Sequence, residues 1–214
     1  MNAIKWDRVL YILLVIATLT SVICWFMGDQ VFTLGFVADC IGTSVTVITV
    51  FSWFFCNVAW KWKMFRKWLV LVPNLNGSWR GKLISDWINP ETNSKLAPID
   101  ATLSIKQSLF RTSCVMKTGE SGSRSIASAF IIEPDNQICK LVYTYQNDPN
   151  QTIQDRSRIH YGTAMLDVNV TGQSIVLGGS YFTGRNTSGQ MIFMYESKGE
   201  KVDDNQETLQ CYIA

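Results

Sequence analysis

The chain has 214 residues and a net charge of +2, and its charged side chains are spread unevenly. Residues 1–72 hold six basic and three acidic side chains, which leaves thirteen basic and fourteen acidic side chains for the rest. A near-neutral second part excludes the strongly basic surface of proteins that bind nucleic acid polymers, since that binding depends on many phosphate contacts. Six cysteines without a CxxC pair and a single histidine argue against a zinc site, so we expect no metal and no cofactor.

Two uncharged runs, residues 9–28 and 40–60, dominate the first part of the chain. Each has about the 20 residues that a helix needs to cross a bilayer. The sequence therefore predicts two transmembrane helices, at about 9–28 and 38–60. The alternative for the first run is a cleaved signal peptide, but the run is long and no small-residue cleavage site precedes Asp29.

The charges that flank these runs predict their orientation. Lys5 and Arg8 precede the first run, basic residues follow the second, and the connection near Asp29 contains no Lys or Arg. By the positive-inside rule, this multi-pass chain keeps its N- and C-termini in the cytoplasm. Residues 61–76 are rich in Trp, Lys and Arg, so we expect a basic interfacial linker that contacts anionic headgroups.

Small and hydroxyl side chains follow one face of the second predicted helix, at Gly42, Thr46 and Thr49. Such residues let membrane helices approach closely. The face either packs on the first helix or joins neighbouring molecules. Asp39 lies either at the outer interface or within the membrane as a functional carboxylate.

After residue 76 the hydrophobic pattern alternates with period two, and Gly, Pro, Asn and Asp separate short runs. Eight runs are strand-like, at 79–84, 99–106, 110–118, 124–133, 138–146, 158–170, 174–184 and 190–197. Short connections favour an antiparallel up-and-down meander, and closure into a barrel removes its exposed edges. We therefore predict an all-β, eight-stranded cytoplasmic barrel over 77–214, either packed solid or able to hold one small ligand.

No catalytic pattern is present: there is no phosphate loop or nucleophile elbow, and His160 is expected to be a structural strand residue. We therefore expect no enzymatic activity. Aromatic and arginine side chains alternate on the predicted strands, an arrangement that can stack on bases and bind phosphate oxygens. The candidate ligand-binding residues are Trp79, Arg80, Tyr143, Tyr145, Arg158, Tyr161, Tyr181, Thr183 and Arg185. The alternative is that the rings pack the barrel and the arginines lie at its rim, and the inward face of each strand stays open.

Two short motifs carry a resemblance to known families. Residues 77–81 read Gly-Ser-Trp-Arg-Gly, and residues 179–189 read Gly-Ser-Tyr-Phe-Thr-Gly-Arg-Asn-Thr-Ser-Gly. A Gly-x-Trp at the start of the first barrel strand resembles lipocalins. With two membrane helices and a basic joint before it, the whole layout resembles the two-transmembrane β-barrel effectors of the cyclic-oligonucleotide-based antiphage signalling system (CBASS).

This resemblance implies an antiviral defence protein of the bacterial inner membrane. Its barrel would bind a cyclic dinucleotide made by a CD-NTase, and the protein would then oligomerise and disrupt the membrane, causing abortive infection. A barrel with a few arginines suits a ligand with two phosphates better than a polymer. Two alternatives remain: a membrane-anchored lipocalin-like barrel that binds an apolar or lipid ligand, and a structural membrane protein whose barrel docks another protein.

Overall fold

The computed structural model describes residues 3–28, 33–90, 92–150, 158–171 and 174–196. The chain divides into two compact units. One contains residues 2–74 together with 108–110, and the other contains the remainder from residue 75 onward. The two units are therefore described one at a time.

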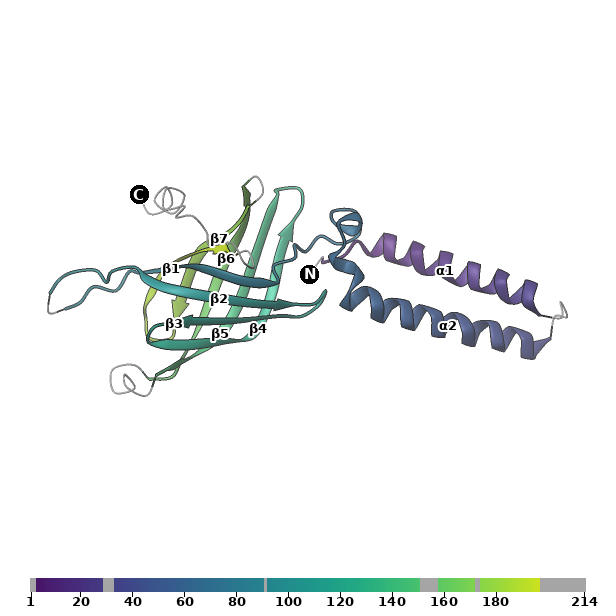
Figure 1. Ribbon diagram of the computed structural model, residues 1–214, viewed down its shortest axis with the longest axis horizontal. Coiled ribbons are helices and arrows are strands. Elements are labelled where there is room, and N and C mark those ends of the chain that lie inside the picture. The colour runs from purple at the N-terminus through teal and green to yellow at the C-terminus, as the bar shows by residue number, and fades with distance from the viewer. Residues whose placement is uncertain (1–2, 29–32, 91, 151–157, 172–173, 197–214) are drawn as a thin grey trace. The chain divides into compact units, whose positions relative to one another are not determined.

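The first unit contains a hairpin of two long apolar helices, α1 (Trp6–Met27) and α2 (Leu34–Asn57) (Figure 1). Both are long and apolar enough to cross a membrane, and nearly all of their side chains are open to the surroundings of the hairpin. The two predicted helices are thus present, each beginning a few residues early. A hydroxyl contact joins them, because Thr20 Oγ1 lies 2.6 Å from Ser44 Oγ.

The base of the hairpin is folded rather than extended. Two short 3₁₀ helices, η1 (Ala59–Lys61) and η2 (Lys63–Phe65), follow α2. The N–H of Lys5 donates to the Leu69 carbonyl at 3.1 Å, and the N–H of Leu71 donates to the Ala3 carbonyl at 3.0 Å. The segment after α2 is therefore bonded to the residues that precede α1.

The second unit is a closed antiparallel barrel in which each strand pairs with its neighbours in chain order and β8 pairs with β1 (Figure 1). This confirms the predicted eight-stranded up-and-down barrel. Its strands are β1 (Gly77–Ser85), β2 (Ile99–Gln107), β3 (Thr112–Thr118), β4 (Ser121–Glu133), β5 (Ile138–Pro149), β6 (His160–Thr171), β7 (Ser174–Thr183) and β8 (Ser188–Tyr195).

Alternation along the strands separates an inner from an outer face. On β1, Trp79 is fully buried and Leu83 is 8% exposed, whereas Arg80 between them points outward. One irregularity breaks the period: the β4–β5 register shifts between Ser125 and Ala127. Inward positions on β4 are therefore odd-numbered before this bulge and even-numbered after it, as at Phe130.

The Gly-x-Trp motif has a structural reason at the start of β1. Gly77 has φ +141°, a conformation that side chains with a Cβ rarely adopt. A Cβ there would also lie 2.6 Å from a ring carbon of Tyr195. The Tyr195 ring in turn meets Trp79 edge to face, with ring centroids 5.2 Å apart. The motif thus packs three residues where β1 meets β8.

Candidate functional site: the polar end of the barrel

One end of the barrel is closed by the residues that lead into β1. Leu75 is fully buried, and its N–H donates to Gln107 Oε1 at 2.8 Å. Its carbonyl accepts a hydrogen bond from the Trp79 indole at 3.0 Å. Asn76 and Gln107 exchange two further hydrogen bonds. We call this the plugged end.

The half of the interior next to the plugged end is apolar and filled. The side chains that fill it are 2% exposed or less and come from five strands: Leu103, Ile105, Leu141, Leu166, Leu177 and Phe193. Dispersion contacts and burial of this apolar surface hold the barrel closed. These six side chains offer a ligand no polar group.

The opposite end has a different lining. Here β1, β3, β5 and β7 finish, and β2, β4, β6 and β8 begin. Direct cross-strand partners share a face of the sheet, so the pairs Ser123–Asn147, Asn147–His160 and Gly162–Thr183 show which side chains point inward. We call this the polar end; its polar inward residues include Ser85, Ser123, Asn147, His160 and Thr183, and the apolar Ile99 and Pro149 also point inward there.

The polar end carries no fixed charge. Along the inward positions of the eight strands, as far as the structure describes them, there is no Asp, Glu, Lys or Arg. A buried anion without a paired cation is strongly disfavoured. The interior therefore suits a neutral, hydrogen-bonding group.

Three tyrosines lie below the polar end. The Tyr145 ring lies over Gly162 on the neighbouring strand, and a Cβ at Gly162 would lie 2.5 Å from the Tyr145 hydroxyl oxygen. The Tyr181 ring lies over Gly189 in the same way. Tyr143 and Tyr145 have ring centroids 5.9 Å apart. Burial, and secondarily Tyr181, raises the pKa of Tyr145 to about 12. Burial also raises the pKa of Tyr143, so these phenols are neutral hydrogen-bonding groups at physiological pH.

Two buried hydroxyls in this region lack a hydrogen-bond partner among the described residues: Ser123 Oγ and Tyr143 OH. Ser123 is 4% exposed and Tyr143 is 2% exposed. Their neighbours on the β4–β5 wall are satisfied: Ser125 Oγ accepts from the N–H of Cys114, and Ser128 Oγ donates to the Thr112 carbonyl.

The structure divides the residues predicted to bind ligand among four places. Tyr143, Tyr145, Tyr181 and Thr183 come together on the inner face near the polar end. Trp79 is also inside, but it belongs to the plugged end.

The remaining predicted residues are exposed. Arg158 lies two residues before β6, and Arg185 lies in the turn after β7, so both flank the polar end. Arg80 is on the outer face, 2.7 Å from the Glu196 carboxylate. Tyr161 is also on the outer face, with 58% of its surface exposed.

The Thr183 hydroxyl contacts two residues of the turn between β7 and β8. Its hydroxyl lies 2.6 Å from that of Thr187 and accepts a hydrogen bond from the Arg185 N–H at 3.3 Å.

The small polar residues Ser85, Ser123 and Asn147 lie on the inner face but are not among the residues predicted from the sequence, and His160, expected to be a structural strand residue, lies on β6. His160 Nδ1 donates to the Arg158 carbonyl at 3.0 Å. The available signal was the repetition of serine at every second position, at Ser121, Ser123 and Ser125, where a packed barrel would carry apolar side chains.

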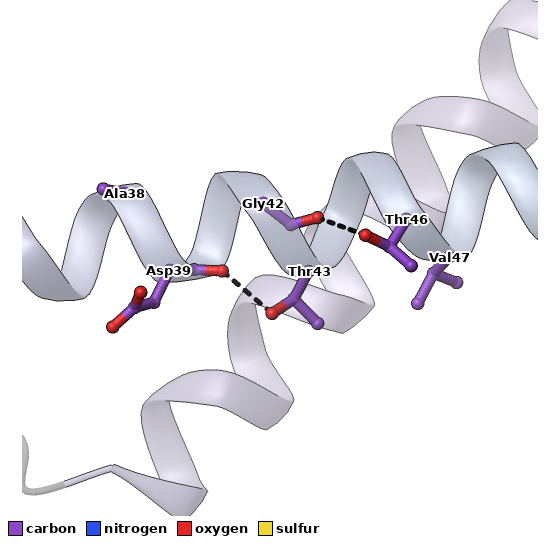
Figure 2. Close-up of a pocket in the computed structure, with 6 residues that line it drawn as sticks. All are labelled: Ala38, Asp39, Gly42, Thr43, Thr46 and Val47. Atoms are coloured by element: carbon purple, nitrogen blue, oxygen red, sulfur yellow. Dashed lines mark hydrogen bonds between the residues drawn. The ribbon is translucent and has the colours of Figure 1, made fainter.

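A second feature lies on α2, in the other unit. Gly42, Thr46 and Thr49 are exposed, and a Cβ on Gly42 would meet nothing within 4 Å. The contact with α1 is instead made by Ser44, through Thr20. A shallow groove of about 520 Å³ is lined in part by Asp39, Gly42 and Thr46, and Figure 2 shows these residues on one stretch of α2. The Thr46 hydroxyl donates to the Gly42 carbonyl at 2.9 Å, as the dashed line in Figure 2 marks.

Comparisons with known proteins identify the family of the chain. The family model for the Cap15 cyclic dinucleotide receptor domain matches residues 70–194, which is more than half of the chain. CD-NTase-associated protein 15 of Staphylococcus schleiferi is 27% identical over 186 residues, covering 87% of this chain and 90% of that protein. The matched region contains the whole run from β1 to β7 and nearly all of β8. The chain therefore belongs to the Cap15 family of CBASS effectors, whose cyclic dinucleotide receptor domain corresponds here to the barrel.

Proposed function

We propose that this protein is a CBASS effector that binds a cyclic dinucleotide at the polar end of its barrel. The observation that carries the proposal is an uncharged, hydroxyl- and amide-lined end, with tyrosine rings beneath it, in a barrel whose other end is plugged. Tyrosine faces stack on nucleobases, and hydroxyl and amide groups bond to base edges. Arg158 and Arg185 flank the same end, where guanidinium groups can bind the two phosphates from outside.

The proposed consequence of binding is assembly and membrane disruption. The helices α1 and α2 anchor the protein in the bacterial inner membrane with both termini cytoplasmic, as the flanking Lys and Arg residues favour. The stripe of Gly42, Thr46 and Thr49 is exposed on the hairpin, so it is available to neighbouring copies. Ligand-driven assembly would then perturb the bilayer and cause abortive infection. The role is binding, without catalysis.

A lipocalin-like apolar ligand has weaker support. The apolar half of the interior is filled by side chains that are 2% exposed or less, such as Leu103 and Leu166. An apolar ligand would have to displace this core, and deletion or displacement of core side chains costs about 2–5 kcal/mol each.

Calorimetry on the full chain in lipid nanodiscs tests the proposal. The titrants are cyclic di-AMP, cyclic di-GMP and cyclic di-UMP, with AMP as the non-cyclic control. We expect at least one of the three to bind with a Kd below about 1 µM, which corresponds to about −8 kcal/mol. Absence of binding by all three, with a folded barrel, contradicts the receptor function.

A further inference from the structure

The unpartnered hydroxyls of Ser123 and Tyr143 lie on adjoining strands of the barrel wall. Ser123 on β4 pairs directly with Asn147 on β5, and Tyr143 lies deeper along β5 on the same face. Buried polar groups in proteins nearly always have a hydrogen-bond partner, so each exception calls for an explanation. Two exceptions on one wall, both inside the proposed ligand end, point to a partner that arrives with the ligand.

From these two hydroxyls and the uncharged interior, we infer that a nucleobase enters the barrel and that Ser123 and Tyr143 bond to its edge. The phosphates stay outside the barrel, beside Arg158 and Arg185 at the polar end. This inference rests on the proposed function and specifies which part of the ligand lies inside. Asn147 is opposite Ser123 and carries both an amide donor and an amide acceptor, which suits the mixed edge of a base.

Electrostatics decides which part of the ligand goes inside. A cyclic dinucleotide carries two negative charges, both on its phosphates. Burial of these charges among Ser, Asn and Tyr side chains would leave them without a cation. The bases are neutral, and Tyr145 beside Asn147 on the same face offers one of them an aromatic surface.

The serine column on β4 provides its own controls. Ser125 faces Tyr145 and Ser128 faces Tyr143, but both hydroxyls are already bonded to the β3 backbone. These bonds replace a missing ladder, because β3 and β4 pair at only three positions, from Val115–Arg124 to Lys117–Gly122. Ser125 and Ser128 thus link β4 to β3. The Ser123 hydroxyl, opposite Met116 within that short ladder, makes no hydrogen bond to the described residues.

Because Ser123 has no partner while Ser125 and Ser128 do, serine-to-alanine substitution is expected to have opposite effects on stability at these positions. Ser123→Ala removes a buried hydroxyl that has no partner, so thermal stability stays equal or rises, while affinity for the best cyclic dinucleotide falls about threefold to tenfold, the range for one neutral hydrogen bond. Tyr143→Phe behaves in the same way. Ser125→Ala and Ser128→Ala lower thermal stability, because each leaves a β3 backbone group unpaired. Tyr195→Phe, near the plugged end, leaves affinity unchanged.

The experiment measures Kd and melting temperature for these variants of the full chain in nanodiscs, against cyclic di-AMP, cyclic di-GMP and cyclic di-UMP. Contact with a base edge predicts that Ser123→Ala and Tyr143→Phe change the ratio of affinities among the three ligands by about threefold or more. Affinities equal to wild type in both variants overturn the inference, and so does an equal loss for all three ligands, which indicates phosphate contact. In either case the receptor function stands; it fails only if the wild-type chain binds none of the three.

Discussion

The Tyr181 ring lies across Gly189, its direct partner on the neighbouring strand. A Cβ at Gly189 would come 2.7 Å from Tyr181 Cε1, 2.9 Å from its hydroxyl oxygen and 2.2 Å from the Ile84 carbonyl oxygen. Tyr145 and Gly162 repeat the arrangement on β5 and β6. Each glycine lets a ring lie along the barrel wall, which places aromatic surface at the polar end.

Gly189→Ala should destabilise the barrel by about 1–3 kcal/mol, because the new methyl group must displace Tyr181 or the backbone. Gly178→Ala is the matched control, since a Cβ at Gly178, also within the sheet, meets nothing within 4 Å. We expect it to leave stability unchanged or to raise it by about 0.4–1 kcal/mol. Near-ultraviolet circular dichroism melts of the full chain measure both variants. Equal melting temperatures for Gly189→Ala and wild type would contradict the Tyr181–Gly189 packing.

Arg158 and Arg185 should contribute charge-assisted bonds to the ligand. Alanine at either position should weaken binding by about 1.5–3 kcal/mol, for all cyclic dinucleotides alike and less so in high salt. Arg80 is the comparison, because it lies on the outer face in an ion pair with Glu196. We expect Arg80→Ala to leave affinity within about twofold, because the Arg80 side chain lies outside the barrel and away from the proposed ligand. A larger loss of affinity for alanine at Arg80 than at Arg158 or Arg185 would indicate a ligand site on the outer face instead.

Stability should fall at alkaline pH. Burial raises the pKa of Tyr145 to about 12, above the value of about 10 for an unfolded tyrosine. This contribution is therefore complete below about pH 10 and is lost as the pH rises toward 12, because only the unfolded chain then ionises readily. Burial acts on Tyr143 in the same direction.

Thermal melts between pH 8 and pH 11 test this, with tyrosine ionisation followed by absorbance (a range set about the ordinary tyrosine pKa of about 10). Tyr145→Phe should flatten the loss of stability. Equal pH profiles for wild type and Tyr145→Phe would exclude burial of that phenol.

Ligand-driven assembly should depend on the small face of α2. Leucine at Gly42 or Thr46 fills the groove but favours insertion, so the protein should still reach the membrane. Ile41→Phe, exposed on α2 but outside the face formed by Gly42, Thr46 and Thr49, is the control for added volume. Cross-linking in membranes, with and without ligand, should show less assembly for the first two variants only. Unchanged assembly in both would remove this face from the contact between copies.

Much of the fold could be predicted because membrane helices and strands have strong local signals. The uncharged runs predicted α1 and α2, and the alternation after residue 76 predicted the strands. The period alone, however, does not say which alternate set faces inward, since both sets carry aromatics. Tyr145 points inward and Tyr161 outward, although both appeared equally suitable for a ligand.

The candidate site was harder to predict for two physical reasons. The bulge between Ser125 and Ala127 reverses the inward parity of β4, so no single alternation describes that strand. Several of the residues that line the polar end are small and polar, and serine or asparagine is equally common in turns. Only the pairing of Ser123 with Asn147 shows that both belong to the interior.

Photoaffinity labelling of the full chain tests the central claim most directly. The tightest-binding cyclic dinucleotide, with an azido group on its base, is irradiated in complex with the nanodisc-embedded protein, and the modified peptides are identified by mass spectrometry. We predict adducts on the inner-face peptides of β4, β5 and β7 around Ser123, Tyr145 and Tyr181, which excess unlabelled ligand abolishes. Competable adducts confined to the outer-face residues Arg80 and Tyr161, or to α1 and α2, would contradict binding at the polar end.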